Sequence, residues 1–279
     1  MVKSFQTWCA NPKRKTLVMG IVNVTPDSFS DGGKYYKARK AMAYACKLIE
    51  DGADIIDVGG ESTRPGADQV SDSEELKRVV PVIESIRSKF PDTLISIDTM
   101  KSSVAKQAVK AGANIINDVS GLSFDGSMSM TAAKLRVPVI IMHMKGNPRN
   151  MQSNPIYKDL INDISSFFIE KIKLGIESGI KENLIILDPG IGFGKTIQHN
   201  FELIANLNKF TKFGFPIMIG PSRKSFIGKT LNLPIEDRID GTSAAVTAGI
   251  MNGARIVRVH DVKEIKRVVT IVDKIRTSK

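Results

Sequence analysis

Residues 53–66 read Ala53-Asp-Ile-Ile-Asp-Val-Gly-Gly-Glu-Ser-Thr-Arg-Pro-Gly66, a short apolar run followed at once by a polar loop rich in glycine. Runs of this kind recur along the chain, and each is followed by turn residues and then by a longer amphipathic stretch. This repetition is typical of alternating strands and helices. We expect eight strands, at residues 17–24, 54–58, 94–98, 115–118, 137–143, 184–188, 216–220 and 255–259.

Helical patterns fill the stretches between these runs. Ser73 is followed by two glutamates, which favour the start of a helix. Glycines at Gly52, Gly112, Gly179 and Gly253 fall where helices should end. We expect helices at residues 37–51, 73–89, 102–111, 127–135, 157–178, 199–208, 237–252 and 263–276.

The character and number of the strands decide between two α/β architectures. Strands that are nearly continuous apolar runs belong to a parallel sheet covered on both faces. An open doubly wound sheet usually has about five or six strands, whereas eight strand–helix units in roughly 250 residues match a closed (β/α)8 TIM barrel. No linker or shift in composition divides the chain. We therefore predict a single barrel domain at residues 16–279, after a loose or lid-forming N-terminal lead-in at residues 1–15.

Composition narrows the cellular setting. The chain has 279 residues, of which 42% are apolar, enough for a substantial core. Its two cysteines, Cys9 and Cys46, are too few for a disulfide framework and lack the spacing of metal ligands, which favours a reducing compartment. The sequence shows neither a secretory leader nor an apolar run long enough to span a membrane. We expect a cytoplasmic protein.

The net charge leaves two interpretations. Forty Lys and Arg against 29 Asp and Glu give a formal charge of +11, which could indicate a nucleic-acid partner. The basic residues are dispersed among the helices, without a stripe of alternating aromatic and basic residues. A solvated lysine-rich surface explains this pattern better. We expect no nucleic-acid or membrane partner, and a specific anion site remains possible.

Polar residues end every expected strand. In a (β/α)8 barrel, the loops that follow the strands carry the chemistry. Asn, Asp and Gly also suit ordinary turns, so each residue alone has a plain structural explanation, but all eight ends together indicate an active site. The polar ends are Asn23, the loop 59–66, Asp98, Asn117 with Asp118, Met142 with His143, Asp188, the run 220–224, and Arg258 with His260.

Cations gather at one part of this rim. Arg258 and His260 are two residues apart, so a strand presents both on the same face. Arg64 and Lys224 are further cations available at this rim. Arginine supplies fixed paired donors and lysine a point charge, a combination that suits a diphosphate or a carboxylate.

A second group of strand ends suits a different ligand. Asp98, Asn117 and Asp188 offer convergent hydrogen-bond acceptors and donors. Such a set fits a flat heterocycle with several N–H groups. The substrate should therefore have a ring at one end and an anionic group at the other.

Five motifs occur in order along the chain and are more specific than any single residue. They are Asn23-Val-Thr-Pro-Asp-Ser-Phe-Ser-Asp-Gly-Gly33, Gly60-Glu-Ser-Thr-Arg-Pro-Gly66, Asp188-Pro-Gly-Ile-Gly-Phe-Gly-Lys195, Ser222-Arg-Lys224 and Arg258-Val-His260. With them, roughly residues 16–276 closely resemble the dihydropteroate synthase family, the transferases of folate biosynthesis that sulfonamides target. The resemblance implies condensation of (7,8-dihydropterin-6-yl)methyl diphosphate with 4-aminobenzoate, with release of diphosphate. It also implies a homodimer built through C-terminal helices.

The resemblance implies a role for each matching residue. The pterin would be held by Asp98, Asn117, Asp188 and Lys224, in a pocket lined by Val119, Met142, Phe193 and Gly220. The diphosphate would be bound by Thr63, Arg64, Arg258 and His260. The 4-aminobenzoate would be framed by Phe29, Thr63, Pro65, Ser222 and Lys224. A Mg2+ ion would be held by Asn23 and Asp31. The catalytic set would be Lys224, Arg258, His260 and Asp31.

Two alternatives remain beside this interpretation. The corrinoid methyltransferases that use methyltetrahydrofolate are also pterin-binding barrels and would share Asp98, Asn117 and Asp188. They would not need the loop 25–33, the run 222–224, or Arg258 and His260. A catalytically silent pterin-binding protein would not need intact diphosphate and metal residues. We therefore expect the synthase reaction.

Overall fold

A computed structural model of the chain describes residues 5, 7–9, 11, 13–25, 34–63, 66–148 and 150–278, with only the backbone described at residues 34–37. Eight strands lie where the sequence predicts them, with ends that differ by a few residues. They are β1 (Leu17–Asn23), β2 (Ile55–Gly59), β3 (Leu94–Asp98), β4 (Ile115–Asp118), β5 (Val139–Met142), β6 (Ile185–Asp188), β7 (Ile217–Ile219) and β8 (Ala254–Val259).

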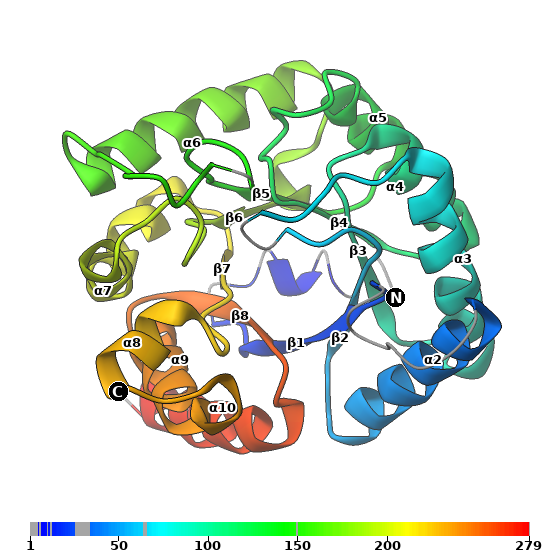
Figure 1. Ribbon diagram of the computed structural model, residues 1–279. Coiled ribbons are helices and arrows are strands. Elements are labelled where there is room, and N and C mark those ends of the chain that lie inside the picture. Colours follow the sequence, from blue (N-terminus) through cyan, green and yellow to red (C-terminus); the bar gives the residue numbers. More distant parts are fainter. Residues whose placement is uncertain are drawn as a thin grey trace.

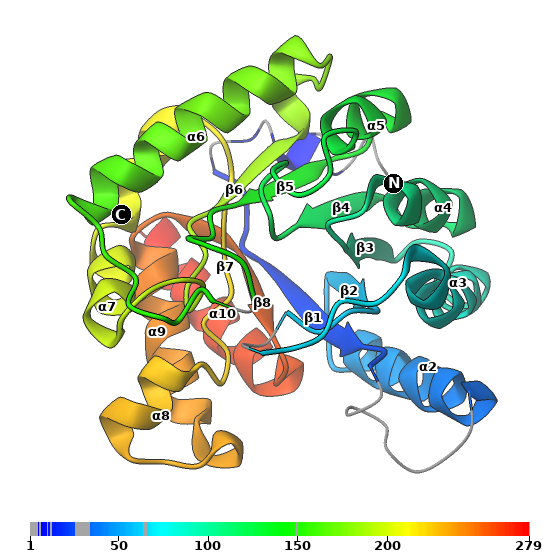
Figure 2. The same cartoon turned by 45° about the horizontal axis from the view of Figure 1, so that its top comes forward.

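The strands form a closed parallel barrel in the order of the sequence. The closure is made by β1 and β8, with Leu17 opposite Ile256 and Gly20 opposite Val259. Figure 1 looks along the barrel, with the strands as an inner ring and the helices outside it, and Figure 2 shows the same arrangement tilted. The predicted (β/α)8 barrel is confirmed.

Nine α-helices of the described chain surround the strands. They are α2 (Lys34–Glu50), α3 (Asp72–Lys89), α4 (Ser102–Ala111), α5 (Met128–Leu135), α6 (Leu160–Glu177), α7 (Ile197–Ala205), α8 (Ser225–Leu231), α9 (Ile239–Met251) and α10 (Val262–Thr277). None of the helices in the described part of the chain combines the length and the apolar character that crossing a membrane requires.

All eight predicted helices are present, most with ends that differ by one to three residues, and α8 is an additional helix that the sequence analysis did not predict. Helix α3 begins at Asp72, because Ser71 is its N-cap and the Ser71 side chain accepts the backbone N–H of Glu74. Helix α8 lies in a stretch where the sequence predicts a loop. It has only seven residues, too few to show a helical repeat.

Alternation of side chains along each strand decides which residues reach the inside of the barrel. Outward side chains such as Val18, Ile56 and Ile116 pack in the core beneath the helices. The inward side chains near the amino ends of the strands form a second apolar cluster, which includes Leu17, Met19, Ile55, Ile115, Ile140, Ile186, Met218 and Ile256. Further along the strands the same alternation brings polar residues inward, among them Asn23, Asp57, Asp98, Asn117, Asp188 and Arg258.

The N-terminal segment covers the amino end of the barrel. Phe5 and Cys9 are 3% and 5% exposed and join the inward apolar cluster, and Trp8 packs beside them with its ring centroid 5.2 Å from that of Phe5. The expectation of a loose or lid-forming lead-in is therefore wrong for these residues. They lie opposite the strand-end loops, because the apolar side chains at this end would otherwise face water.

Hydrogen bonds tie this segment to the last helix. Asp273 of α10 accepts the backbone N–H of Thr16 over 2.7 Å and its hydroxyl over 2.8 Å. Arg276 donates from Nη2 to the carbonyl oxygen of Arg14 over 3.0 Å. The segment just before β1 thus lies against the last turns of α10.

Candidate active site

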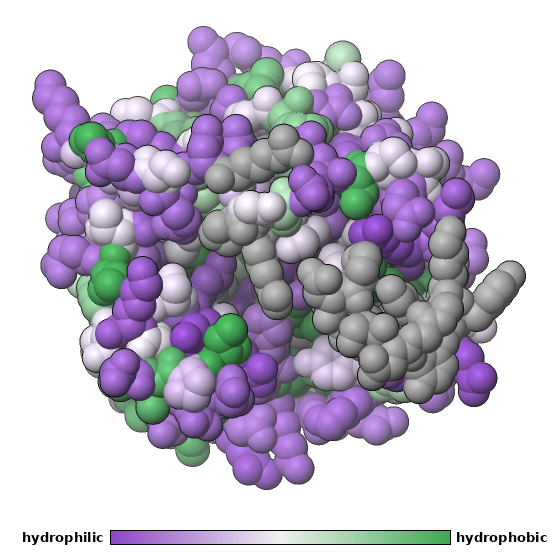
Figure 3. All heavy atoms as spheres, viewed as in Figure 1, coloured by the Kyte–Doolittle hydropathy of each residue, from purple (hydrophilic) through white to green (hydrophobic). Residues whose placement is uncertain are grey.

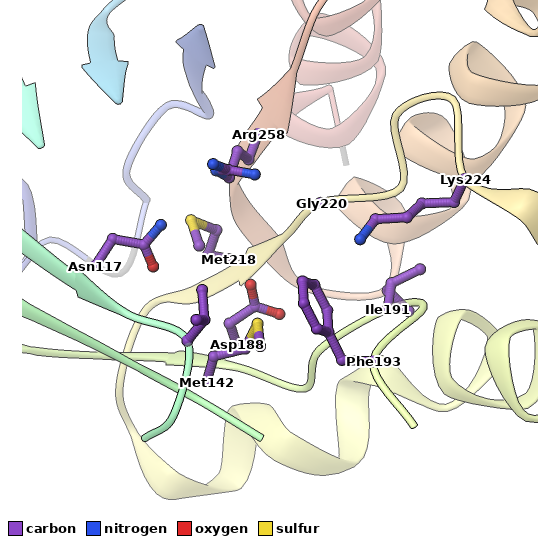
Figure 4. A pocket seen from close by; sticks show the side chains of 10 residues that line it. Asn117, Met142, Asp188, Ile191, Phe193, Met218, Gly220, Lys224 and Arg258 are labelled. Carbon is purple, nitrogen blue, oxygen red and sulfur yellow. The ribbon is translucent and has the colours of Figure 1, made fainter. Parts of the chain in front are cut away.

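A pocket lies at the carboxyl ends of β4 to β8. The face that carries these strand ends is mostly hydrophilic and hollowed near its centre (Figure 3). The pocket brings together every residue predicted for the pterin site except Asp98, which contacts Arg258 in its wall. Its lining, shown in Figure 4, consists of Asn117, Val119, Met142, Asp188, Ile191, Phe193, Met218, Gly220, Lys224 and Arg258.

One wall of the pocket is apolar. Val119, Met142 and Phe193 pack in a small cluster with Met100 and Met151. All five are buried, and Val119, Met142 and Phe193 line the pocket. A flat ring can pack against such a wall.

Strands β4 and β6 each contribute one hydrogen-bonding side chain to the lining of the pocket, Asn117 and Asp188. Asn117 is 1% exposed, and its Nδ2 donates to Oδ2 of Asp57 over 3.2 Å, while its Oδ1 has no partner within the described structure. Asp188 accepts the backbone N–H of Gly190 over 2.7 Å, and burial raises its pKa to about 6. The lining of the pocket therefore includes an amide and a carboxylate, two side chains that can accept hydrogen bonds.

Arg258 joins two buried carboxylates. Its Nε donates to Oδ2 of Asp57 over 2.6 Å, and its Nη2 donates to Oδ2 of Asp98 over 2.7 Å. Burial raises the pKa of Asp98 to about 7, an effect that the charge of Arg258 opposes and that of Asp57 increases. The family resemblance assigns Arg258 to the diphosphate and Asp98 to the pterin. In the structure the two residues form one ion pair.

Asp57 is a residue of this site that the sequence reasoning did not single out. Its side chain is fully buried on β2 and contacts both Arg258 and Asn117. The sequence contained a sign of this role. Asp57 is the one charged residue of β2, and it lies two residues after Ile55, so its side chain also points into the barrel. A carboxylate in such a strand needs a partner inside the barrel.

The loop after β7 connects the pocket to β8. Nζ of Lys224 lies 4.0 Å from the ring centroid of Phe193, and burial together with the charge of Arg258 lowers the pKa of Lys224 to about 8. Oγ of Ser222 lies 3.0 Å from Nδ1 of His260 and accepts the backbone N–H of His260. Burial and the charge of Arg258 lower the pKa of His260 to about 3, so its ring is neutral near pH 7.

The loop after β6 packs closely against the end of β5. Gly190 has a φ of +71°, and a Cβ there would lie 1.9 Å from the carbonyl oxygen of His143. Nζ of Lys195 donates to the carbonyl oxygen of Phe193 over 2.9 Å and lies 3.1 Å from Nδ1 of His143. Only glycine fits this approach, which holds Phe193 at the pocket.

Of the site residues predicted in the first two loops and at their strand ends, the structure describes Asn23 and Thr63, and both are half-buried. Oδ1 of Asn23 and Oδ2 of Asp98 each lie 3.7 Å from the position that a Cβ would take on Gly59, so the glycine leaves space between them. The other predicted residues of these loops lie outside the described chain, namely Phe29, Asp31, Arg64 and Pro65.

The loop that carries Thr63 is fixed at its base by Lys101. Nζ of Lys101 contacts the carboxylates of Glu61 and Glu75, the second over 2.6 Å. Burial raises the pKa of Glu75, and its hydrogen bond with Lys101 opposes that rise. This buried charge cluster, which the sequence reasoning also missed, anchors the start of the second loop.

The chain is similar to known proteins over most of its length. Residues 19–260 match the family described as pterin binding enzyme. The dihydropteroate synthase of Bacillus subtilis (strain 168) is 52% identical over 261 residues, which cover 94% of this chain and 89% of that protein. The crystal structure of the Yersinia pestis dihydropteroate synthase with a sulfonamide drug complex is 46% identical, with a TM-score of 0.89 over 95% of each chain. The Xanthomonas albilineans dihydropteroate synthase with 4-aminobenzoic acid is 41% identical, with a TM-score of 0.89 over 95% of this chain and 94% of that one.

Proposed function

Since the chain belongs to the dihydropteroate synthase family of pterin-binding enzymes, we propose how its barrel makes dihydropteroate. The substrates are (7,8-dihydropterin-6-yl)methyl diphosphate and 4-aminobenzoate. The amine nitrogen of 4-aminobenzoate forms a C–N bond to the pterin methylene, and the C–O bond to the diphosphate breaks. The diphosphate leaves with the electron pair, and the nitrogen loses a proton.

The unpartnered Oδ1 of Asn117 beside the carboxylate of Asp188 is the observation that carries the assignment of the pterin. A dihydropterin is a flat ring with several N–H groups, which these acceptors would take up. Lys224 would donate to an acceptor of the ring. The pterin site would be completed by Asp98, Val119, Met142, Phe193 and Gly220.

We assign the diphosphate to the rim beside β2 and β8. Arg258 brings a guanidinium to the wall of the pocket, and His260 follows two residues later on the same face of the chain. His260 is held by Ser222, so its position is set before a ligand arrives. Thr63 and Arg64 would complete this site from the second loop.

We assign the 4-aminobenzoate to the mouth of the pocket. Ser222 and Lys224 would approach it from the loop after β7, and Thr63 from the loop after β2. The remaining contacts would come from Phe29 and Pro65. Closure of these loops would order the weakly basic amine beside the pterin methylene.

We also propose a Mg2+ site at the end of β1. Asn23 offers a neutral amide oxygen beside the space left by Gly59, and Asp31 would add a carboxylate. This donor set fits, because Mg2+ is usually held by one or two protein oxygens together with phosphate oxygens. When bound, the ion would supply positive charge to the leaving diphosphate.

The protein residues would stabilise the two charges that develop as the C–O bond breaks. Arg258 and His260 would donate to the diphosphate, and a preorganised donor of this kind is worth roughly 2.7–4 kcal/mol. Asp98 and Asp188 would accept N–H groups of the ring and so favour positive charge that spreads into it. The reaction needs no covalent nucleophile.

A coupled assay of diphosphate release tests the proposed function. We expect release that requires both 4-aminobenzoate and Mg2+, with dihydropteroate formed in equal amount. Release of diphosphate without 4-aminobenzoate would contradict the condensation. No release under any condition would instead favour a silent pterin-binding protein.

We expect pterin affinity to rise with pH between about 5 and 8. Burial raises the pKa of Asp98 to about 7 and that of Asp188 to about 6, and each accepts N–H groups best when ionised. Calorimetric titration with a pterin measures the trend. The variant Asp188→Asn should remove the Asp188 part of the pH dependence, and an affinity independent of pH in the natural protein would be at odds with these roles.

The free protein should show the opposite trend in stability. Because the folded-state pKa values of Asp98 and Asp188 are raised, their contribution to the free energy of unfolding is fully present below about pH 4. It is lost as the pH rises through about 6 and 7. Urea denaturation without ligand would separate this effect from ligand binding.

We further propose a homodimer formed through α7, α8 and α9, in a cytoplasmic protein. Large apolar side chains are exposed on these contacting helices and on the turn after α8, namely Ile197, Phe201, Leu231, Ile235 and Met251. A second copy of the chain would remove them from water. Sedimentation should give a dimer that Phe201→Lys with Leu231→Lys weakens, and a monomeric natural protein would rule the dimer out.

A further inference from the structure

We propose that Asp57 is a positioning residue, which sets the directions of the Asn117 amide and the Arg258 guanidinium and thereby the hydrogen-bonding pattern that the pocket offers to the pterin. This inference rests on the proposed function. Asp57 does not line the pocket and would act through its two partners.

The contact with Asn117 decides which amide atom faces the ligand. An ionised carboxylate only accepts hydrogen bonds, so the amide nitrogen must be the atom that lies 3.2 Å from Oδ2 of Asp57. The reversed amide would bring two oxygens together at that distance. Asp57 therefore leaves Oδ1 of Asn117, buried and without a partner in the described structure, as the atom offered to the pocket.

The contact with Arg258 fixes the plane of the guanidinium. Nε is bound by Asp57 and Nη2 by Asp98, and a planar group held at two nitrogens cannot rotate freely. In the proposed function Asp98 also accepts an N–H of the pterin. With Asp57 on Nε, Arg258 stays in place when Asp98 shares its carboxylate with the ligand.

The position of Asp57 in the barrel supports this role. It lies opposite Ser96 in the register of β2 and β3, two residues before the Gly59–Asp98 pair at the rim. A largely buried ion pair contributes little to stability compared with apolar side chains of similar volume. Its occurrence at this level of the barrel, in contact with two residues of the pocket, fits a role in placing them.

The variant Asp57→Asn tests the proposal, because it keeps the shape of the side chain and removes its charge. We expect the dissociation constant of a dihydropterin, measured by calorimetry, to rise roughly 10- to 100-fold, the range for losing a hydrogen bond to a charged group. We expect kcat to fall as well, since Arg258 also loses a partner. Ser96→Ala is the matched control at the same level of the barrel. Its Oγ has no partner in the described structure, and we expect unchanged affinity and kcat.

A double-mutant cycle separates positioning from general damage. If Asp57 acts on the pterin through Asn117, the substitution Asp57→Asn should cost much less affinity in an Asn117→Ala background than in the natural protein. Wild-type affinity in Asp57→Asn would overturn the proposal. So would a cycle in which the two losses simply add.

The conservative variant Asp57→Glu covers the case in which Asp57→Asn does not fold. It keeps a negative charge beside Arg258 but moves the carboxylate. Pterin affinity should therefore fall while the protein remains folded. Affinity equal to that of the natural protein would overturn the proposal. Failure of the proposed function is distinguishable, since the natural protein would then release no diphosphate whatever the outcome of these variants.

Discussion

The substitution Arg258→Ala is expected to lower turnover by at least about 100-fold, the typical effect of removing one preorganised donor to a developing negative charge. Pterin affinity should fall less, because Asn117, Asp188 and Lys224 remain in the pocket. Steady-state kinetics and calorimetry with a pterin measure the two effects. Unchanged turnover would remove Arg258 from the leaving-group site.

The same substitution should also lower the free energy of unfolding by about 3–5 kcal/mol, because it leaves the buried carboxylates of Asp57 and Asp98 without a counter-ion. Arg255→Ala is the matched control on the same strand. Arg255 donates to the carbonyl oxygens of Ile250 and Ala254 and is not among the residues that line the pocket. Urea denaturation should therefore show a clearly smaller loss for Arg255→Ala, and equal losses would contradict the importance of the ion pairs.

The substitution Gly190→Ala is expected to displace the loop after β6. The positive φ costs about 1–2 kcal/mol in a residue with a Cβ, and the overlap with the carbonyl oxygen of His143 adds a packing cost of about 1–3 kcal/mol. Movement of the loop would carry Phe193 away from Lys224. We therefore expect reduced thermal stability together with a clear loss of pterin affinity.

Gly214→Ala distinguishes the effect of the loop from that of backbone strain. Gly214 has a φ of +81°, close to that of Gly190, but nothing lies within 4 Å of the position of its Cβ. We expect this variant to lose about 1–2 kcal/mol of stability and to bind pterin normally. Equal pterin affinity in both variants would show that Gly190 has no part in holding the pocket.

The sequence predicts the barrel and much of the pocket because both depend on local patterns. Buried strands are visible as apolar runs, and alternation along a strand then indicates which end residues turn inward. Asn117 and Asp188 follow directly from this rule, and the pocket brings them together. The roles of the pocket residues rest on the family resemblance and on the chemistry of their side chains.

The features that the sequence did not reveal depend on contacts between distant segments. Asp57 stands within a strand rather than at its end, and its importance appears only when Arg258, 201 residues later, lies against it. Phe5 shows no sign of being buried until the amino end of the barrel is assembled around it. The anchor at Lys101 likewise joins distant segments, because Lys101 stands at the start of α4 and contacts Glu61 of the second loop and Glu75 of α3.

The contact between Thr16 and Asp273 has a consequence for synthesis, because it joins residues that are 257 positions apart. The ribosome delivers β1 long before its neighbour β8 and the helix α10. Until β8 and α10 have been made, a nascent chain therefore carries a β1 edge without its β8 partner, and Phe5 and Cys9 lack the completed barrel that buries them. Contacts of such long range form slowly, and exposed apolar surface favours aggregation. The final turns of α10 thus decide when a newly made chain escapes that risk.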